Sequence, residues 1–404
     1  MSERGPALRR LLIAGAVALL GLGVALALVV GVTGQAQASK APVHGLKKKQ
    51  HQPPSFQLDP TWPKALPNNW VFGGADSVAT DKRGHVWVLS RPAGVPAAEL
   101  AAGKLPAPPV IELDRDGTFI RGWGGPQWVQ PWFQTASPLP DYPIGTPAEH
   151  GIYVDGDGNV WVTGSGHIVL KFSPAGELLL QIGRFNETDG SDNTELLGNP
   201  TDTAVDTKNN EVYVADGYLN RRVIVFDSET GAYKRHWGAY GNVPSDAQPP
   251  ELYEPDRPLP QQFFIVHGIQ LSKDGLLYVS DRQRDRIQVF RKDGTFVREV
   301  VVDGDAPAGG GITVTGQFTN PAVAAAGFGS VTRTAFSGDS AQRYLYAASL
   351  RGTVYILRRK DLTTVGSFPA VGLHHIATDP DGNIFISDGR APKRYALTPP
   401  PKKG

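Results

Sequence analysis

Three histidines, His150, His267 and His374, occupy the same position in three copies of an internal repeat, each five residues before a small polar residue that opens a turn. Histidine holds this position in the second, fourth and sixth copies. If six copies close into a ring, the three side chains lie a third of a turn apart and can converge on one point. Three neutral imidazoles with an open fourth position are typical of a catalytic zinc site. Nickel and copper also accept imidazole, so the pattern predicts a metal site and leaves the metal's identity open.

The same position in two other copies holds Asp76 and Thr201, counted back from Asp81 and Asp206. The chain has nine histidines, and most of them do not share this register. Those expected to be ordinary core or surface residues are His44, His51, His85, His167 and His236. Of these, His167 lies in the second copy, where it can approach the same site.

The composition excludes several classes of protein. Lys and Arg number 40 and Asp and Glu 39, which leaves a formal charge of +1 and argues against a nucleic-acid partner. The 47 glycines and 34 prolines suit many short strands joined by turns rather than a helical protein. The absence of cysteine excludes disulfides and thiolate chemistry, so a chain of 404 residues must be held together by its core.

Residues 1–38 are predicted to direct export. Arg9 and Arg10 precede an uncharged run over residues 11–32, and Ala36-Gln37-Ala38 has the form of a cleavage site. The run is also long enough to span a bilayer, so this segment is either a cleaved signal peptide or a membrane anchor. In both cases the remainder is expected to be exported, whether secreted, periplasmic or held at the outer face of the cytoplasmic membrane. Residues 39–54 are predicted to form a flexible tether.

The recurring unit predicts four short antiparallel strands over about forty or more residues, which is typical of a β-propeller blade. Asp-Gly turns separate the strands and supply the positive φ that tight hairpins need. The units begin near residues 73, 149, 198, 263, 313 and 372. The fifth is irregular, with its clearest strand at residues 345–348, and the sixth ends short. The chain is therefore predicted to be an all-β, six-bladed propeller over residues 55–397, closed by an outer strand from residues 55–64 and followed by a tail at 398–404.

Hairpin geometry places the candidate residues on one face of the ring. The histidine position begins the first strand of a blade, and the second strand returns antiparallel to it. The start of the first strand and the end of the second therefore share one mouth of the central channel. Arg91, Tyr218 and Arg282 lie just past the second strands of blades one, three and four, so they are expected to face the histidines.

The Trp-Gly and Asp-Gly units, with the segments at residues 216–222 and 281–290, resemble NHL repeats. Most of residues 73–397 resembles the peptidyl-α-hydroxyglycine α-amidating lyases. This resemblance implies that His150, His267 and His374 bind zinc. It also implies that Tyr218 is the base toward the substrate hydroxyl, and that Arg91 and Arg282 bind the substrate carboxylate or stabilise a phenolate.

The chain departs from that family beside the third histidine. The lyases have an aspartate there that helps to hold a structural calcium, whereas this chain has His375. The difference counts against calcium and leaves His375 as an alternative metal ligand to His374.

The sequence favours a zinc-dependent lyase that cleaves the C–N bond of a carbinolamide to give an amide and glyoxylate. Its expected partner is a small-molecule or peptide substrate, with membrane attachment through residues 11–32 as a further expectation and no nucleic acid. The alternative is a non-enzymatic, extracytoplasmic NHL propeller that binds a protein or ligand. A calcium-dependent, lactonase-like propeller would need acidic and amide oxygens at the channel, and three histidines are the wrong ligands for it.

Overall fold

The computed structural model describes residues 52–133, 149–247, 257–305, 329–387 and 389–398. The predicted export segment, and all of the predicted tether before residue 52, lie outside these ranges. Within the described residues, no helix is both long enough and apolar enough to cross a membrane.

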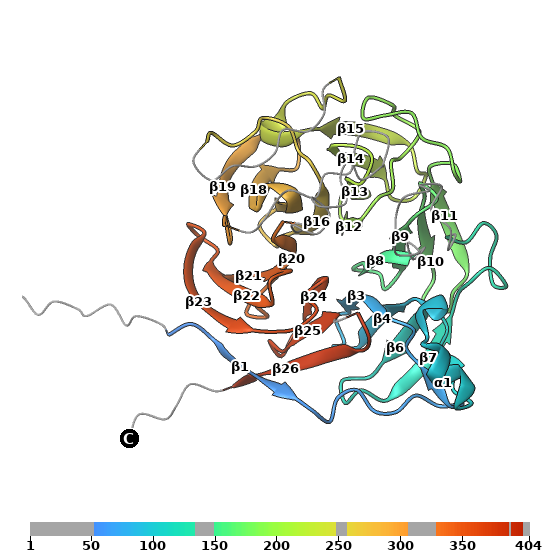
Figure 1. Cartoon of the computed structure of the whole chain (residues 1–404). Coiled ribbons are helices and arrows are strands. Elements are labelled where there is room, and N and C mark those ends of the chain that lie inside the picture. Colours follow the sequence, from blue (N-terminus) through green and yellow to red (C-terminus); the bar gives the residue numbers. More distant parts are fainter. Residues whose placement is uncertain (1–51, 134–148, 248–256, 306–328, 388, 399–404) are drawn as a thin grey trace, which may run out of the picture. The chain divides into compact units, whose positions relative to one another are not determined.

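Six antiparallel sheets of four strands each are arranged around a central axis, which confirms the predicted six-bladed propeller (Figure 1). From the innermost strand outward, blade one contains β3 (Ala75–Thr80), β4 (Val86–Ser90), β6 (Val110–Leu113) and β7 (Phe119–Trp123). Blade two contains β8 (Glu149–Val154), β9 (Val160–Gly164), β10 (Val169–Phe172) and β11 (Leu178–Ile182). Blade three contains β12 (Asp202–Asp206), β13 (Glu211–Asp216), β14 (Arg222–Asp227) and β15 (Tyr233–Trp237).

The remaining blades follow the same order. Blade four contains β16 (Val266–Leu271), β17 (Leu276–Asp281), β18 (Arg286–Arg291) and β19 (Phe296–Val301). Blade five contains β20 (Val331–Phe336), β21 (Tyr344–Ser349), β22 (Thr353–Arg358) and β23 (Thr363–Pro369). Blade six contains β24 (His375–Thr378), β25 (Ile384–Ser387), β26 (Pro392–Thr398) and β1 (Ser55–Asp59).

A few short elements lie outside the blades. The Pro- and Ala-rich stretch of the first unit is an insertion between β4 and β6. It holds α1 (Ala97–Ala101), the 3-10 turn η1 (Pro92–Gly94) and β5 (Leu105–Pro106), which pairs in parallel with β2 (Trp70–Val71). Two further 3-10 turns are η2 (Ala239–Gly241) and η3 (Arg282–Arg284).

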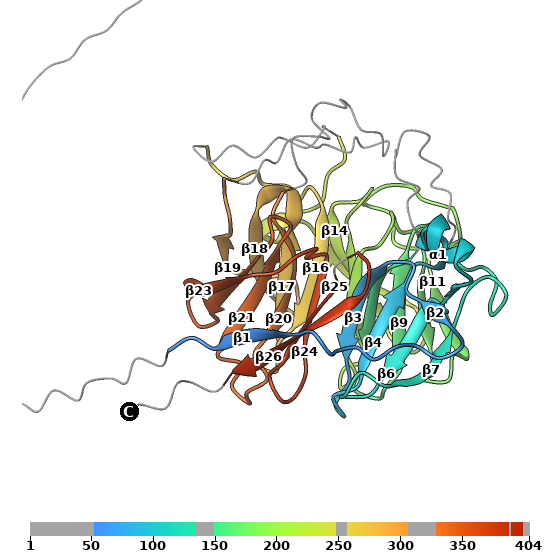
Figure 2. The ribbon, with the colours of Figure 1, turned by 60° about the horizontal axis from the view of Figure 1, so that its bottom comes forward.

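Strand β1 completes blade six as the sequence predicts. It pairs antiparallel with β26, from Ser55 opposite Thr398 to Asp59 opposite Arg394. Figures 1 and 2 both show β1 beside β26 at the outer edge of this blade. The side chain of Phe56 packs against Phe368 of blade five, with ring centroids 5.0 Å apart. The ring is therefore closed by strands from opposite ends of the propeller sequence.

Blade five departs from the predicted boundaries. The strand expected at residues 345–348 is confirmed within β21. The first strand of this blade, β20, begins at Val331, later than the predicted unit start near residue 313, which lies outside the described residues. The first strand of this blade is hard to recognise because β20 reads VTRTAF, and its buried Arg333 interrupts the apolar pattern of a strand.

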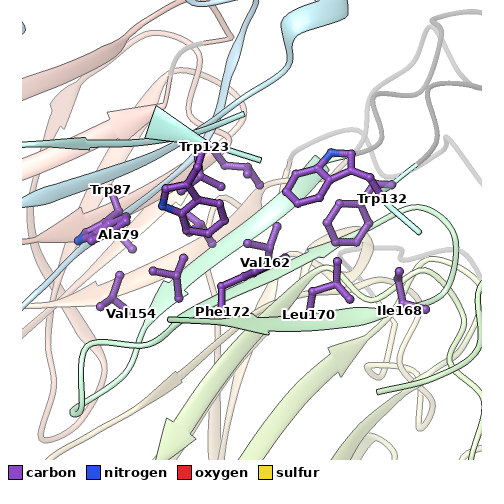
Figure 3. Close-up of a cluster of buried hydrophobic side chains, with 14 residues drawn as sticks. Ala79, Trp87, Trp123, Trp132, Val154, Val162, Ile168, Leu170 and Phe172 are labelled. Atoms are coloured by element: carbon purple, nitrogen blue, oxygen red, sulfur yellow. The ribbon is translucent and has the colours of Figure 1, made fainter. Parts of the chain in front are cut away.

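Trp-Gly pairs in the repeat have a packing role between blades. Trp123 ends the outer strand of blade one and lies against Phe172 of blade two, with ring centroids 4.9 Å apart (Figure 3). A Cβ atom on Gly176, in the β10–β11 turn, would lie 2.8 Å from the Trp123 ring. Trp237 makes the same approach to Gly294 of the next blade, also at 2.8 Å. The glycine in each outer turn therefore leaves room for the tryptophan of the preceding blade.

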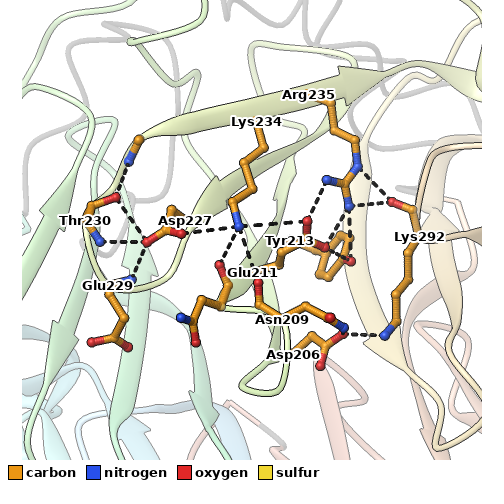
Figure 4. Close-up of polar contacts among 12 residues, drawn as sticks. Asp206, Asn209, Glu211, Tyr213, Asp227, Glu229, Thr230, Lys234, Arg235 and Lys292 are labelled. Atoms are coloured by element: carbon orange, nitrogen blue, oxygen red, sulfur yellow. Dashed lines mark hydrogen bonds and ion pairs between the residues drawn. The ribbon is translucent and has the colours of Figure 1, made fainter.

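Polar contacts also join neighbouring blades at their edges (Figure 4). Arg235 pairs with both carboxylate oxygens of Glu211 at 2.7 Å and donates from Nε to the Lys292 carbonyl of blade four at 2.9 Å. The Lys292 ammonium in turn pairs with Asp206 of blade three. A side chain–carbonyl hydrogen bond and an ion pair therefore join blade three to blade four.

Candidate metal centre and active site

The three histidines meet at one end of the channel. His150 is the second residue of β8, His267 is the second residue of β16, and His374 directly precedes β24. Their ring centroids are 4.7–4.9 Å apart in all three pairs. One ligand nitrogen from each ring lies within 4.8 Å of the others. The ring of six blades therefore brings together the trio that the repeat register predicts.

Each imidazole is oriented by the backbone of the next blade. The Nδ1 atom of His150 lies 2.8 Å from the Thr201 carbonyl, and that of His267 lies 3.0 Å from the Thr332 carbonyl. Nδ1 of His374 lies 2.9 Å from the Asp76 carbonyl. A carbonyl only accepts hydrogen bonds, so Nδ1 carries the proton in each ring. Nε2 then keeps its lone pair for a metal, which is the tautomer that zinc ligands require.

The three residues whose carbonyls accept these hydrogen bonds share a register with the histidines. Thr201, Thr332 and Asp76 hold the histidine position in blades three, five and one. The six residues at this position form the first layer of the channel, namely Asp76, His150, Thr201, His267, Thr332 and His374. Ligands and their supports therefore alternate around the ring, and each ligand is held by a neighbour that contributes no ligand of its own.

Side chains of the supporting residues bind back to the ligand strands. The hydroxyl of Thr201 donates to the carbonyl of Val266, the residue before His267, at 2.8 Å. The hydroxyl of Thr332 donates to the carbonyl of Leu373, the residue before His374, at 3.0 Å. These two bonds fix the backbone on which the next histidine stands.

In blade one, different residues hold the backbone before the next histidine. Its first-layer residue is Asp76, whose carboxylate pairs with the Arg91 guanidinium at 2.7 Å. Nε of Arg91 donates to the carbonyl of Glu149, the residue before His150, at 2.9 Å. Asp76 and Arg91 together thus occupy the place that a threonine hydroxyl fills in blades three and five. Arg91 is therefore fixed at the edge of the histidine site.

Glycine follows the histidine in blades two and four because space is short. A Cβ atom on Gly151 would lie 2.3 Å from the Thr201 carbonyl oxygen, the acceptor of the His150 hydrogen bond. A Cβ atom on Gly268 would lie 2.7 Å from the Thr332 carbonyl oxygen, which accepts from His267. The His-Gly-Ile motif therefore reflects the close approach of the neighbouring strand.

Burial keeps the three imidazoles neutral. Desolvation lowers the pKa of His150 and of His267 well below the ordinary value, and lowers the pKa of His374 to about 3. The nearby Arg91 and Arg282 guanidinium groups act in the same direction. Neutral imidazole is the metal-binding form, so the site retains its ligand capacity in mildly acidic solution.

Tyr218 and Arg282 lie directly against the histidines. The Tyr218 hydroxyl is 3.0 Å from Nε2 of His150 and 3.4 Å from Nε2 of His267. Nη1 of Arg282 donates to the same hydroxyl at 3.4 Å, and its guanidinium lies 5.5 Å from the centre of the Tyr218 ring. The phenol oxygen is therefore placed between a fixed cation and the nitrogens that face the site.

All six residues singled out from the sequence thus lie around one mouth of the channel: Arg91, His150, Tyr218, His267, Arg282 and His374. His375, the alternative ligand, is not in the group of converging nitrogens. Its ring stacks on that of His374 at 4.9 Å, and its Nδ1 atom lies 2.5 Å from the Ser77 hydroxyl. His167 is not in this group either, and its Nδ1 atom accepts from the Asn199 amide at 3.1 Å.

The residues beside His375 do not fit a calcium ion. Calcium takes six to eight oxygen ligands, usually with several carboxylates. At this level of the channel the first-strand residues supply one carboxylate, that of Asp202, and it pairs with Arg333 at 2.9 Å. Nη1 of Arg333 also approaches Nδ1 of His375 at 3.2 Å, so a cationic side chain already lies there.

A second group of possible ligands is better explained as an ion-pair cluster. Asp81, His85 and Glu112 lie within 4.8 Å of one another near the opposite ends of the inner strands. Arg83 bonds to both carboxylates, at 2.7 Å to Asp81 and 2.9 Å to Glu112. Arg121 pairs with the other Glu112 oxygen at 2.8 Å. Two guanidinium groups already balance the two carboxylates.

Asp202 and Arg333 had no place in the sequence predictions, and Asp76 was recognised only by its register and was given no role. Register is the signal that would identify them. Asp76 holds the histidine position in blade one, and the other two residues lie one position later in blades three and five. Asp202 and Arg333 are separated by 131 positions, so their pairing becomes visible only when the ring is built.

No protein-family model matches the chain. Several known proteins, however, are similar to the chain in sequence. The chain is 30% identical over 266 residues to peptidyl-glycine alpha-amidating monooxygenase A of Xenopus laevis, which covers 62% of this chain and 24% of that protein. It is 32% identical over 144 residues to a probable peptidyl-alpha-hydroxyglycine alpha-amidating lyase of Caenorhabditis elegans, covering 35% of this chain and 36% of the relative. It is 29% identical over 254 residues to NHL repeat-containing protein 3 of Mus musculus, covering 59% and 58%.

The chain therefore spans less than two thirds of each of these relatives. The chain thus has the fold of a six-bladed propeller and is similar, over part of their lengths, to amidating lyases and to an NHL repeat-containing protein.

Proposed function

We propose that this protein is a zinc-dependent lyase that cleaves the C–N bond of a peptidyl-α-hydroxyglycine or a similar carbinolamide. The observation that carries the proposal is the Tyr218 hydroxyl, which lies 3.0 Å from Nε2 of His150 and within reach of Arg282. A proton acceptor, a cation and three neutral imidazoles are thus assembled at a single mouth. Similarity to amidating lyases supports the reaction class.

His150, His267 and His374 would hold the zinc. Their Nδ1 protons bond to carbonyls, so three Nε2 lone pairs are directed to the site. When bound, zinc would act as a Lewis acid toward a substrate oxygen. Imidazole also suits nickel and copper, and zinc is favoured because the reaction involves no change of oxidation state.

Tyr218 would accept the proton of the substrate hydroxyl. As the O–H bond breaks, its electron pair forms the carbonyl of glyoxylate, and the C–N bond breaks toward nitrogen. The departing amide nitrogen takes a proton, which Tyr218 can return, and no oxidant is needed. A phenol oxygen must be anionic to act as a base at neutral pH, so a neighbouring cation is required.

Arg282 is placed to stabilise that anion, because its Nη1 atom contacts the Tyr218 hydroxyl. Arg91 is held by Asp76 and by the Glu149 carbonyl, and would bind the substrate carboxylate. The three histidines lie on the innermost strands or directly before them, and Arg91 directly follows β4, so the substrate would meet a rigid set of groups.

Export of the protein forms part of the proposal. The apolar run at residues 11–32 would serve as a signal peptide or an anchor and place the propeller outside the cytoplasm. The partner would be a peptide or small molecule that ends in a hydroxyglycine-like group.

A binding module without catalysis is the second candidate, favoured by the similarity to NHL repeat-containing protein 3. One experiment separates the two. The zinc-loaded protein is incubated with an N-acyl-α-hydroxyglycine, and glyoxylate and the primary amide are measured against the Tyr218→Phe variant. Equal amounts of both products, dependent on Tyr218, would support the lyase. Release no faster than the uncatalysed reaction, from a protein with full zinc occupancy, would favour the binding module.

A further inference from the structure

A second polar layer lies immediately beneath the histidines. It contains the residue that follows each first-layer position, and every member is buried. The members are Ser77, Gly151, Asp202, Gly268, Arg333 and His375. Arg333, from blade five, is 2% exposed and extends toward the strands of other blades.

Arg333 contacts three other blades. Its Nε atom pairs with Asp202 of blade three at 2.9 Å. Its Nη1 atom donates to the Val78 carbonyl of blade one at 3.1 Å and lies 3.2 Å from Nδ1 of His375 in blade six. One guanidinium therefore bridges four of the six blades, including its own.

The two remaining blades join through backbone amides. The Ile152 amide of blade two donates to the Ser77 hydroxyl at 3.1 Å, and that hydroxyl also bonds to His375. The Ile269 amide of blade four donates to the Asp202 carboxylate at 3.0 Å. A single connected network thus includes all six blades.

Such a network needs a cation at its centre. Asp202 is fully buried, and an unpaired buried carboxylate is strongly destabilising. The Val78 carbonyl and the Asp202 carboxylate both point at the Arg333 guanidinium, which has a fixed charge and planar donors suited to several acceptors. These are oxygen groups of the kind that elsewhere surround a bound metal cation.

We propose that Arg333 is a built-in cation that takes the place of a structural metal ion in the channel and positions the His374–His375 segment for the histidine site. The guanidinium ties the blades together without any exchangeable ion. His375 suits this position because a neutral imidazole can accept from an arginine and stack on His374, at an interplanar angle of 22°. Arg333 also lines a cavity of about 430 Å³ among the turns at the far end of the inner strands.

Calcium dependence gives the first test. The purified wild-type protein is dialysed against EGTA, its calcium content is measured, and its thermal midpoint is compared with and without millimolar calcium. We expect no bound calcium and midpoints that agree within about 1 °C. Stoichiometric calcium, or a midpoint several degrees lower in EGTA, would overturn the proposal. This result does not depend on any variant or on the reaction that the protein catalyses.

The second test removes the charge. Arg333→Met is expected to lower the thermal midpoint by more than about 5 °C, because Asp202 is left buried without its partner. Adding Asp202→Asn should restore at least half of that loss. The control is Arg298→Met. Arg298 lies on the outer strand β19 and donates to the carbonyls of Lys360 and Arg359. An Arg333→Met protein as stable as this control would refute the bridging role.

The third measurement separates positioning from stability. Zinc affinity of the histidine site is determined by chelator competition, at a temperature where both Arg333→Met/Asp202→Asn and wild type are fully folded. We expect a loss of about 10- to 100-fold, since groups that orient metal ligands contribute this much. Unchanged affinity would restrict Arg333 to holding the blades together and would overturn the claim about His374.

Discussion

The carbonyl oxygen of Thr201 lies 2.8 Å from Nδ1 of His150, and both residues hold the same position in adjacent blades. This contact recurs in every second blade, so the orientation of each imidazole depends on how closely the next inner strand approaches. The site is therefore sensitive to side chains that alter the spacing between blades.

Gly151→Ala tests this spacing. Its new methyl group would lie 2.3 Å from the Thr201 carbonyl, so the two strands must separate. We expect a loss of about 1–3 kcal/mol in the free energy of unfolding and a fall of about 10- to 100-fold in zinc affinity. Gly366→Ala is the control, because its nearest neighbour would be 3.4 Å away. Equal effects of the two substitutions would show that the approach of β12 does not control the site.

His267→Ala tests the metal site itself. Removing one of three ligands should lower zinc affinity by more than about 100-fold, beyond the effect of losing an orienting group. Metal content after dialysis provides the measurement. His236→Ala serves as the control, since that ring bonds to Tyr233 on an outer strand. Full zinc retention by His267→Ala would contradict the three-histidine site.

Tyr218→Phe tests the proposed base. The substitution keeps the ring against Phe264 and Ile265 and removes only the hydroxyl that contacts His150 and Arg282. We expect kcat to fall by about 10²- to 10⁴-fold, with zinc content unchanged. Tyr233→Phe should retain full activity. If Tyr218→Phe turned over substrate at the wild-type rate, the proton would have to pass to another group.

Stability of the metal-free protein should fall in acid between about pH 6.5 and pH 3. The folded state holds the pKa of His374 at about 3 and those of His150 and His267 well below normal, while the unfolded chain takes up protons near pH 6.5. As the pH falls, protons therefore favour unfolding, by at most about 2 kcal/mol at pH 5 for His374. Urea unfolding at pH 7.5 and pH 5 checks this. His374→Gln should reduce the loss of unfolding free energy between pH 7.5 and pH 5. If the loss is unchanged in this variant, other groups must cause it.

Repetition determined how much could be predicted from sequence. His150, His267 and His374 share a register, so the ring and the convergence of the three side chains followed from the spacing of the repeats. Hairpin direction similarly placed Tyr218 beside them. Arg333 was not predictable, because a charged residue in the middle of β20 hides the strand, and its partner Asp202 is distant in sequence. Burial of Arg333 is favourable only after the ring has formed, because its partner Asp202 belongs to another blade.

The closing strand pair has a mechanical consequence. Ser55 lies opposite Thr398 and Asp59 lies opposite Arg394, so the outward-leading ends of the two strands are at the same end of the ladder. A force pulling those ends apart would load one rung at a time, beginning at Ser55 and Thr398, instead of sharing the load across the ladder. The Asp59–Arg394 ion pair would be the last contact to yield. A ring closed by this strand pair would thus open at low force when pulled by the two strand ends.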